Sequence, residues 1–228
     1  MLLINGCSFA ERWTPSQKLL QTVGCDTFTN LGVRGTSFQR TVRSTIEWVS
    51  KYGKPNCVII PITLASRWEL AVGKTDKHID GSWIGMQHPQ YLNFDDIDKA
   101  IPVDKLTKLI ELYYGVIPNV ISSWDKLFTE IIALASFLDH NEIKYLMFDM
   151  CNNFERKHLQ GIKGIEKIKL IEKNTNIINL FDFCGNKFMY EQLPSDEQRN
   201  IDAYMWHHHA DEYLALEKYL IDYLNHKL

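Results

Sequence analysis

The sequence predicts an α/β protein with three layers, in which helices cover both faces of a parallel sheet. Short apolar segments of strand-like composition alternate with amphipathic helical segments along most of the chain. The first strand-like segment ends in a Gly-x-Ser turn, and one long irregular interval interrupts the alternation after the third. Connections of this strand–helix–strand kind are right-handed and build a parallel sheet with a helical layer on each side.

Five segments have the composition of strands, and four longer ones have helical periodicity. The strands are expected at residues 2–5, 27–30, 58–62, 143–149 and 177–181, and the helices at 38–52, 122–141, 156–173 and 211–224. Because a serine follows the first strand, we expect the flavodoxin-like strand order, in which ligands bind at the carboxyl ends of the strands. The prediction is an α/β/α sandwich around a five-stranded parallel sheet.

A chain of 228 residues, 45% of them hydrophobic, can bury one large core, and we interpret residues 1–228 as a single domain. The interval 68–120 is rich in glycine and proline, yet it holds too many aromatic residues for a solvated linker. We expect it to be an insertion after the third strand that acts as a lid and lines a substrate pocket. Packing against the scaffold alone and a dimer contact are the alternatives.

The serine after the first strand is the first candidate catalytic residue. The apolar run 2–4 passes through Asn5 into a Gly6-Cys7-Ser8 turn, and residues 8–12 can start a helix. A residue at this end of a parallel strand faces the ligand crevice, where helix amides stabilise an anion. The alternatives are a plain connection in which Ser8 caps the helix, and a thiol nucleophile at Cys7.

A second glycine-containing turn follows the second strand. It runs from Asn30 through Gly32 to Gly35, directly before the helix at 38–52. An amide at Gly35 beside the Ser8 hydroxyl would be half of an oxyanion hole, whose donors must lie about 3 Å from the developing negative charge. The alternative is that the loop only turns the chain.

Together these two turns resemble the first blocks of the SGNH/GDSL hydrolase family. The family has Gly-Asp-Ser after its first strand, matched by Gly6-Cys7-Ser8 with Cys7 in place of Asp, and then an Asn-x-x-x-x-Gly loop. The second block is matched by the segment from Asn30 to Gly35. The resemblance implies that Ser8 is the nucleophile and that the amides of Ser8 and Gly35 form part of the oxyanion hole.

The last block of the family places Asp-x-x-His just before the C-terminal helix. His207 stands at that distance from the helix at 211–224, so the resemblance implies that it is the general base, with His208 and His209 as open alternatives. The acidic position holds Tyr204, and Asp202 lies five residues before His207. The interpretation is a Ser-His dyad, or a degenerate triad completed by Asp202.

The third block of the family, Gly-x-Asn-Asp, is replaced here by a Thr-x-x-x-Arg pattern. The strand at 58–62 runs into Thr63, Ser66 and Arg67, so a hydroxyl of Thr63 or Ser66 takes the place of the asparagine as oxyanion donor. Arg67 can bind a carboxylate or phosphate of a substrate, or pair with Glu69 or Asp149. After the fourth strand, Asn152 is a candidate substrate contact, and its alternative is a turn or helix cap.

Composition excludes several functions. A net charge of −3 without a run of five like charges argues against nucleic-acid binding. No apolar stretch is long enough for a leader or a membrane span, and five cysteines without a Cys-x-x-Cys pair fit reduced thiols, so we expect a cytoplasmic protein with no membrane partner. The neighbouring histidines at 207–209 point in different directions on a helix or strand, and we expect no metal and no cofactor.

These observations lead to one functional hypothesis and one alternative. The hypothesis is a serine hydrolase that cleaves a carboxylic ester, with an acyl or acetyl ester of a small molecule or saccharide as substrate. The alternative is a catalytically silent SGNH-like protein that binds a glycan or acyl ligand in the same crevice. A homodimer is compatible with either function.

Overall fold

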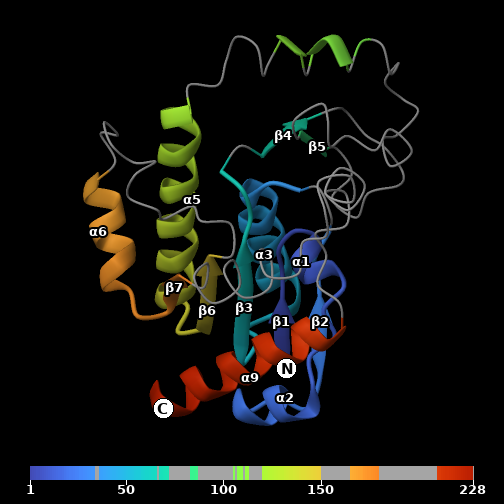
Figure 1. Ribbon diagram of the computed structural model, residues 1–228, viewed down its shortest axis with the longest axis vertical. Helices are drawn as coiled ribbons and strands as arrows, with labels where there is room; N and C mark the ends of the chain where they lie inside the picture. The colour runs from blue at the N-terminus through green and yellow to red at the C-terminus, as the bar shows by residue number, and fades with distance from the viewer. Residues whose placement is uncertain are drawn as a thin grey trace, which may run out of the picture.

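Figure 1 shows the computed structural model of the chain, an α/β protein whose strands form a five-stranded parallel sheet. The structure describes residues 1–33, 36–65, 67–71, 83–86, 105, 107–109, 111–112, 120–149, 165–179 and 210–227. In the sheet, the strands are ordered β2-β1-β3-β6-β7. A separate pair, β4 (Trp68–Ala71) and β5 (Trp83–Met86), is antiparallel and lies beyond the carboxyl end of β3 (Figure 1).

The strand order contains a topological switch point between β1 and β3. The strands are β1 (Leu2–Ile4), β2 (Phe28–Asn30), β3 (Cys57–Ile62), β6 (Lys144–Asp149) and β7 (Ile177–Asn179). β1 is followed in the chain by β2 on one side, and β3 is followed by β6 on the other side. In the parallel register Ile4 lies opposite Asn30 and Ile59. In open α/β sheets, ligands bind outside the carboxyl ends of the strands at such a switch point.

Two helical layers cover the two faces of the sheet because strand residues alternate in direction. On one face, called here the α5 face, α3 (Phe38–Tyr52), α5 (Val120–His140) and α6 (Ile165–Lys173) pack on Leu3 and Ile60. On the other, the α9 face, α1 (Ser8–Glu11), α2 (Gln17–Thr22) and α9 (Ala210–Lys227) contribute to a second core with Leu2, Ile4 and Ile59. Figure 1 shows α9, in red, crossing close to α2, which it contacts. The three-layer prediction agrees with this arrangement.

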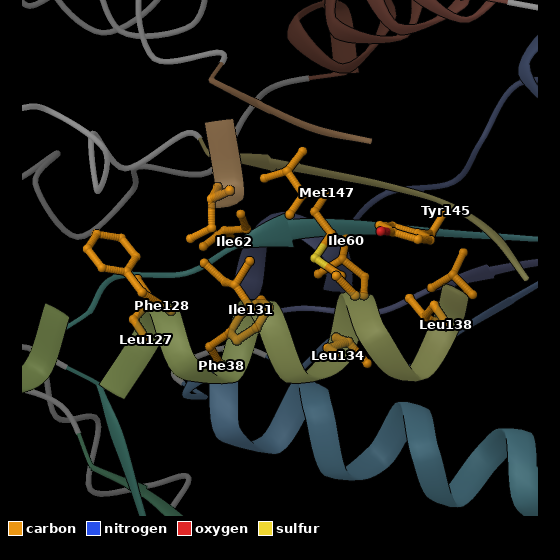
Figure 2. Packing of buried hydrophobic residues seen from close by; sticks show 14 of the residues in the cluster. Phe38, Ile60, Ile62, Leu127, Phe128, Ile131, Leu134, Leu138, Tyr145 and Met147 are labelled. Carbon is orange, nitrogen blue, oxygen red and sulfur yellow. The ribbon is translucent and has the colours of Figure 1, made fainter. Parts of the chain in front are cut away.

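α5 packs on the sheet through an apolar core. Figure 2 shows Ile131 of α5 pointing toward β3, and Phe128, Leu134, Ile60 and Met147 belong to the same core cluster. All five side chains are fully buried. Burying side chains of this size contributes about 1.5–3 kcal/mol each, so this layer holds the sheet against α5 with no polar contact required.

The predicted elements agree with the structure at most positions. All five strands form within a residue of the predicted starts, and the helix predicted at 38–52 is α3. Residues 156–164 and 180–181, predicted as helix and strand, lie outside the described residues. The sequence did not predict α2, where Ser16 caps a helix of six residues, or the pairing of β4 with β5 inside the predicted insertion. None of the helices in the described ranges combines the length and apolar character needed to cross a bilayer.

Candidate functional site

The turn after β1 lies at the switch point of the sheet. Gly6 has a φ of 153°, a conformation that favours glycine, and Cys7 is the N-cap of α1. α1 therefore starts at Ser8, directly beyond the carboxyl end of β1, and the Ala10 and Glu11 amides donate to the Cys7 carbonyl. The sequence predicted this position for Ser8. The structure describes its backbone but not its side chain.

Two glycines let backbone segments pack closely around this turn. A Cβ on Gly6 would lie 3.0 Å from Pro61 Cγ of β3. A Cβ on Gly32, in the loop after β2, would overlap the Glu11 amide nitrogen and lie 2.6 Å from Ala10 Cβ. α1 is thus wedged between the end of β3 and the loop after β2, and any side chain at Gly32 would push it away.

Asn5 fixes the turn from the side of α3. Its side chain is fully buried, its Oδ1 accepts from the Gly6 amide at 2.9 Å, and its Nδ2 lies within 3.1 Å of the Thr41 carbonyl and the hydroxyls of Ser44 and Thr45. A buried amide with this many partners is strongly restrained, because breaking any of the bonds leaves a buried polar group unpaired. The backbone next to Gly6 is therefore held in one geometry.

Asn30, the last residue of β2, fixes α1 from the opposite side. Its Nδ2 donates to the Ala10 carbonyl at 2.6 Å and to the Trp13 carbonyl at 3.0 Å, and its Oδ1 accepts from the Gly32 amide at 2.8 Å. The carbonyls in the last turn of a helix lack amide donors from the helix itself. At the end of α1, the Asn30 side chain donates hydrogen bonds in their place. One side chain thus joins α1 to the loop after β2.

The end of β3 supplies the third side of the site. Thr63 is 1% exposed, and its Oγ1 accepts from Arg67 Nη1 at 3.0 Å and lies 3.5 Å from the Thr36 carbonyl. Thr36 Oγ1 donates to the Val33 carbonyl at 2.7 Å, and the Val33 amide donates to the Gly6 carbonyl at 3.1 Å. The loops after β1, β2 and β3 are therefore linked in series by hydrogen bonds.

The contact that the structure gives for Arg67 is with Thr63, and not one of the two carboxylate pairings considered as an alternative for it. Glu69 is buried in β4 and receives hydrogen bonds from Arg43 Nη2 at 3.1 and 3.3 Å, so an arginine of α3 meets this carboxylate. Arg67 donates to Thr63 and is only partly buried, which leaves its side chain near the switch point. Asp149, the last residue of β6, is fully buried opposite Ile62.

The thiol alternative finds little support in the geometry. Cys7 is fully buried at the N-cap of α1. A thiol with no exposed surface cannot attack a substrate from solvent without local opening. In the ranges that the structure describes, no group of three or more histidine, cysteine or acidic side chains is placed to hold a metal ion.

The remaining predicted site residues lie outside the described residues. They are Gly35, Ser66, Asn152, Asp202 and His207 with its neighbours His208 and His209. Thr63 and Arg67 are the predicted residues whose side chains the structure does describe, and it brings them into direct contact. The roles assigned to all these residues stay predictions.

α9 follows the histidines directly and is tied to the segment after α1 by a buried carboxylate that the sequence analysis missed. Glu217 is 3% exposed and accepts from Trp13 Nε1 at 2.7 Å and from the Ser16 amide at 3.0 Å. The sequence feature that could have revealed Glu217 is its spacing: it stands on the same helical face as Leu220 and Ile221. A charged residue on a buried apolar face needs a polar partner.

Asn5 and Asn30 were also missed as structural residues. Both are amides at the carboxyl ends of adjacent strands, and this repetition was visible in the sequence. What the sequence did not reveal is their partners, because these lie on α3 and α1, 36 and 20 residues away.

The fold and the switch point define an α/β protein with a polar, tightly built turn at the carboxyl end of its parallel sheet. Residues 7–176 match the family described as "Family of unknown function (DUF6071)", and the chain belongs to this family. The matched range starts at the turn after β1 and includes most of the hydrogen-bonded contacts described above. The comparison with curated proteins finds none that matches the chain.

Proposed function

We propose that the protein is a serine hydrolase of the SGNH type, which cleaves a carboxylic ester such as an acyl or acetyl ester of a saccharide. The observation that carries the proposal is the turn that bears Ser8: it lies at the switch point and is held by Asn5, Asn30 and the close contacts of Gly6 and Gly32. A nucleophile must be held within about 0.5 Å of its productive position, and rigid supporting contacts of this kind achieve that.

The strand order β2-β1-β3-β6-β7 supports the same proposal. Counted along the strands of this sheet alone, we take it to correspond to the proposed flavodoxin-like order, in which the crevice lies beside the first strand. The tie between Glu217 of α9 and Trp13 supports the role of His207, because it holds the helix that follows the histidines close to the segment that follows Ser8.

In the proposed reaction, Ser8 Oγ attacks the ester carbonyl carbon while His207 accepts the hydroxyl proton. The carbon–oxygen bond to the alcohol then breaks, and His207 gives the proton to the leaving alcohol. Water then attacks the acyl-enzyme with His207 again as the base, which releases the acid and restores the Ser8 hydroxyl. The amides of Ser8 and Gly35, with the Ser66 hydroxyl, stabilise the oxyanion. Asp202 orients the imidazole, and Asn152 contacts the substrate.

A second function, ligand binding without catalysis, is favoured by the state of Thr63. Its hydroxyl oxygen already accepts from Arg67 and lies against the Thr36 carbonyl. To donate to an oxyanion, it must exchange that carbonyl for the substrate oxygen. A protein that only holds an acyl or glycan ligand needs no such exchange.

Covalent labelling distinguishes the two functions. The protein is incubated with a fluorophosphonate probe, and the added mass is located by peptide mass spectrometry. The hydrolase is expected to be labelled at Ser8, with labelling lost in Ser8→Ala and in His207→Ala and retained in Ser50→Ala, whose serine is exposed on α3. A folded wild-type protein that stays unlabelled and hydrolyses no short-chain aryl ester contradicts the hydrolase and favours the binding function.

A further inference from the structure

We infer that Arg67 and Thr63 act together as a positioning pair, which braces the loop after β2 against the turn that bears Ser8. The pair acts through Thr36 and Val33, and neither Arg67 nor Thr63 need touch the substrate. This inference deepens the proposed hydrolase function, on which its catalytic consequence rests.

The first step of the argument is the continuity of the contacts. Arg67 Nη1 donates to Thr63 Oγ1, Thr63 lies against the Thr36 carbonyl, and Thr36 Oγ1 donates to the Val33 carbonyl. The Val33 amide then donates to the carbonyl of Gly6. Each residue both receives and passes on a contact, so a displacement at Arg67 reaches the backbone two residues before Ser8.

The second step is burial. Thr63 is 1% exposed and Thr36 is 7% exposed, so water does not easily replace the contacts between them. A hydrogen bond donated by a guanidinium is stronger than a neutral one, and here it fixes the rotamer of the Thr63 hydroxyl. The weakest contact is the 3.5 Å approach of Thr63 to Thr36, which depends on Thr63 being held from its other side.

The third step is what the brace holds. Gly32, which leaves no room for a side chain against α1, and Val33, which bonds to Gly6, stand together in the loop after β2. In the sequence Gly35, the proposed oxyanion donor, stands between Val33 and Thr36. Fixing Val33 and Thr36 restricts the backbone on either side of that donor. Misplacing a catalytic group by about 1 Å can cost about a hundredfold in rate.

The test measures amide exchange of Val33 by NMR in the full chain. Thr63→Val removes the hydroxyl at nearly constant volume, and Arg67→Met removes the donor and keeps an unbranched side chain. Each is expected to speed exchange at Val33 about fivefold, the factor for one lost hydrogen bond. The double variant is expected to be no faster than the faster single one, because both changes interrupt one series of contacts. Arg67→Lys, which retains a donor, is expected to restore part of the protection.

Thr22→Val is the matched control. Its hydroxyl donates to the Lys18 carbonyl in α2, at the opposite end of the molecule (Figure 1), and its removal is expected to leave Val33 exchange unchanged. The positioning role is wrong if Val33 exchanges at the wild-type rate in Thr63→Val and Arg67→Met. It is also wrong if the effects of the two changes multiply in the double variant.

Fluorophosphonate labelling tests the catalytic consequence separately. The labelling rate at Ser8 is expected to fall about tenfold in Thr63→Val and in Arg67→Met, with little change in KM for a neutral aryl ester. If Arg67→Met raises KM for an anionic ester while Thr63→Val changes nothing, Arg67 is a substrate ligand and the positioning role is wrong. A wild-type protein that is not labelled overturns the hydrolase and this consequence, whereas the exchange result judges the brace itself.

Discussion

The two faces of the sheet are held by different kinds of interaction. On the α5 face, α5 and α6 pack on β3 and β6 through apolar side chains such as Ile131 and Ile168, whereas α3 is also joined to the end of β1 by the hydrogen bonds of Asn5. On the α9 face, apolar packing is joined by directional polar contacts: Glu217 joins α9 to Trp13, and Asn30 joins α1 to β2. Apolar packing is non-directional and sets stability, whereas hydrogen bonds fix the position of a backbone. The directional contacts gather around the turn that carries Ser8, with Asn5 holding it from α3 and Asn30 holding α1 on the α9 face.

This comparison predicts that the two faces respond differently to substitution. A change in the apolar packing of α5 and α6 should lower the free energy of unfolding and leave the site geometry of the remaining folded molecules intact. A change to the polar contacts of the α9 face should cost less stability and more function. The predictions below run from the largest expected loss of stability to the smallest.

The largest loss is expected from Phe128→Ala. Phe128 is fully buried in the core of the α5 face (Figure 2), and the cavity left by its ring should cost about 3–5 kcal/mol of unfolding free energy. Urea denaturation measures it. Leu170→Ala on α6, 55% exposed, is the control and should change stability by less than about 0.5 kcal/mol. If Phe128→Ala abolishes Ser8 labelling under conditions where the protein stays folded, the separation of the faces is wrong.

The next largest is expected from Glu217→Ala. The change leaves Trp13 Nε1 and the Ser16 amide without their acceptor in a buried site, which should cost about 2–3 kcal/mol. Glu217→Gln retains one acceptor oxygen and should cost less. Labelling at Ser8 should slow more than in Phe128→Ala, relative to the folded fraction. The control is Glu166→Ala, which removes an exposed ion pair with Lys169 worth little in water. Equal effects of Glu217→Ala and Glu166→Ala on stability and labelling would contradict the role of Glu217 in joining α9 to the segment after α1.

Much of the α5 face was predictable from the sequence, and much less of the α9 face. The strand at 58–62 and the helix at 38–52 were predicted because apolar periodicity is a local signal that burial imposes. α2 was missed because six residues are too short to display a period. The partners of Asn5, Asn30 and Glu217 were missed because a hydrogen bond between distant segments depends on tertiary geometry, and the sequence shows only that a polar group stands where burial is expected.

A smaller loss is expected from Gly32→Ala, which tests how tightly α1 is wedged. The added methyl overlaps the Glu11 amide, so the loop or α1 must shift, at a cost of about 1–3 kcal/mol. Labelling at Ser8 should slow strongly. The control is Gly24→Ala: Gly24 has a φ of 68°, but a methyl group there would meet nothing within 4 Å, so the variant should lose about 1 kcal/mol from backbone strain and label normally. Equal labelling in the two variants would show that close packing at Gly32 does not position Ser8.

The smallest effect concerns the apolar part of the α9 face at the amino end of the sheet, where Cys57 lies opposite Leu2. Burial raises the pKa of the Cys57 thiol from 9.0 to about 12. Between these values the unfolded chain releases the thiol proton and the folded protein retains it, so the free energy of unfolding falls as pH rises, by about 1.4 kcal/mol per unit above pH 9. Below pH 9 this thiol contributes little pH dependence.

Cys57→Ala isolates this contribution, because Tyr145 and Tyr223, whose pKa values are also raised by burial, titrate in both proteins. The stability difference between wild type and Cys57→Ala should be constant up to about pH 8 and shift by about 1.4 kcal/mol against the wild type by about pH 10. Urea denaturation at both pH values measures it. Parallel pH profiles of stability for wild type and Cys57→Ala would mean that water reaches the thiol. The α9 face would then lack the water-free core that strengthens its hydrogen bonds.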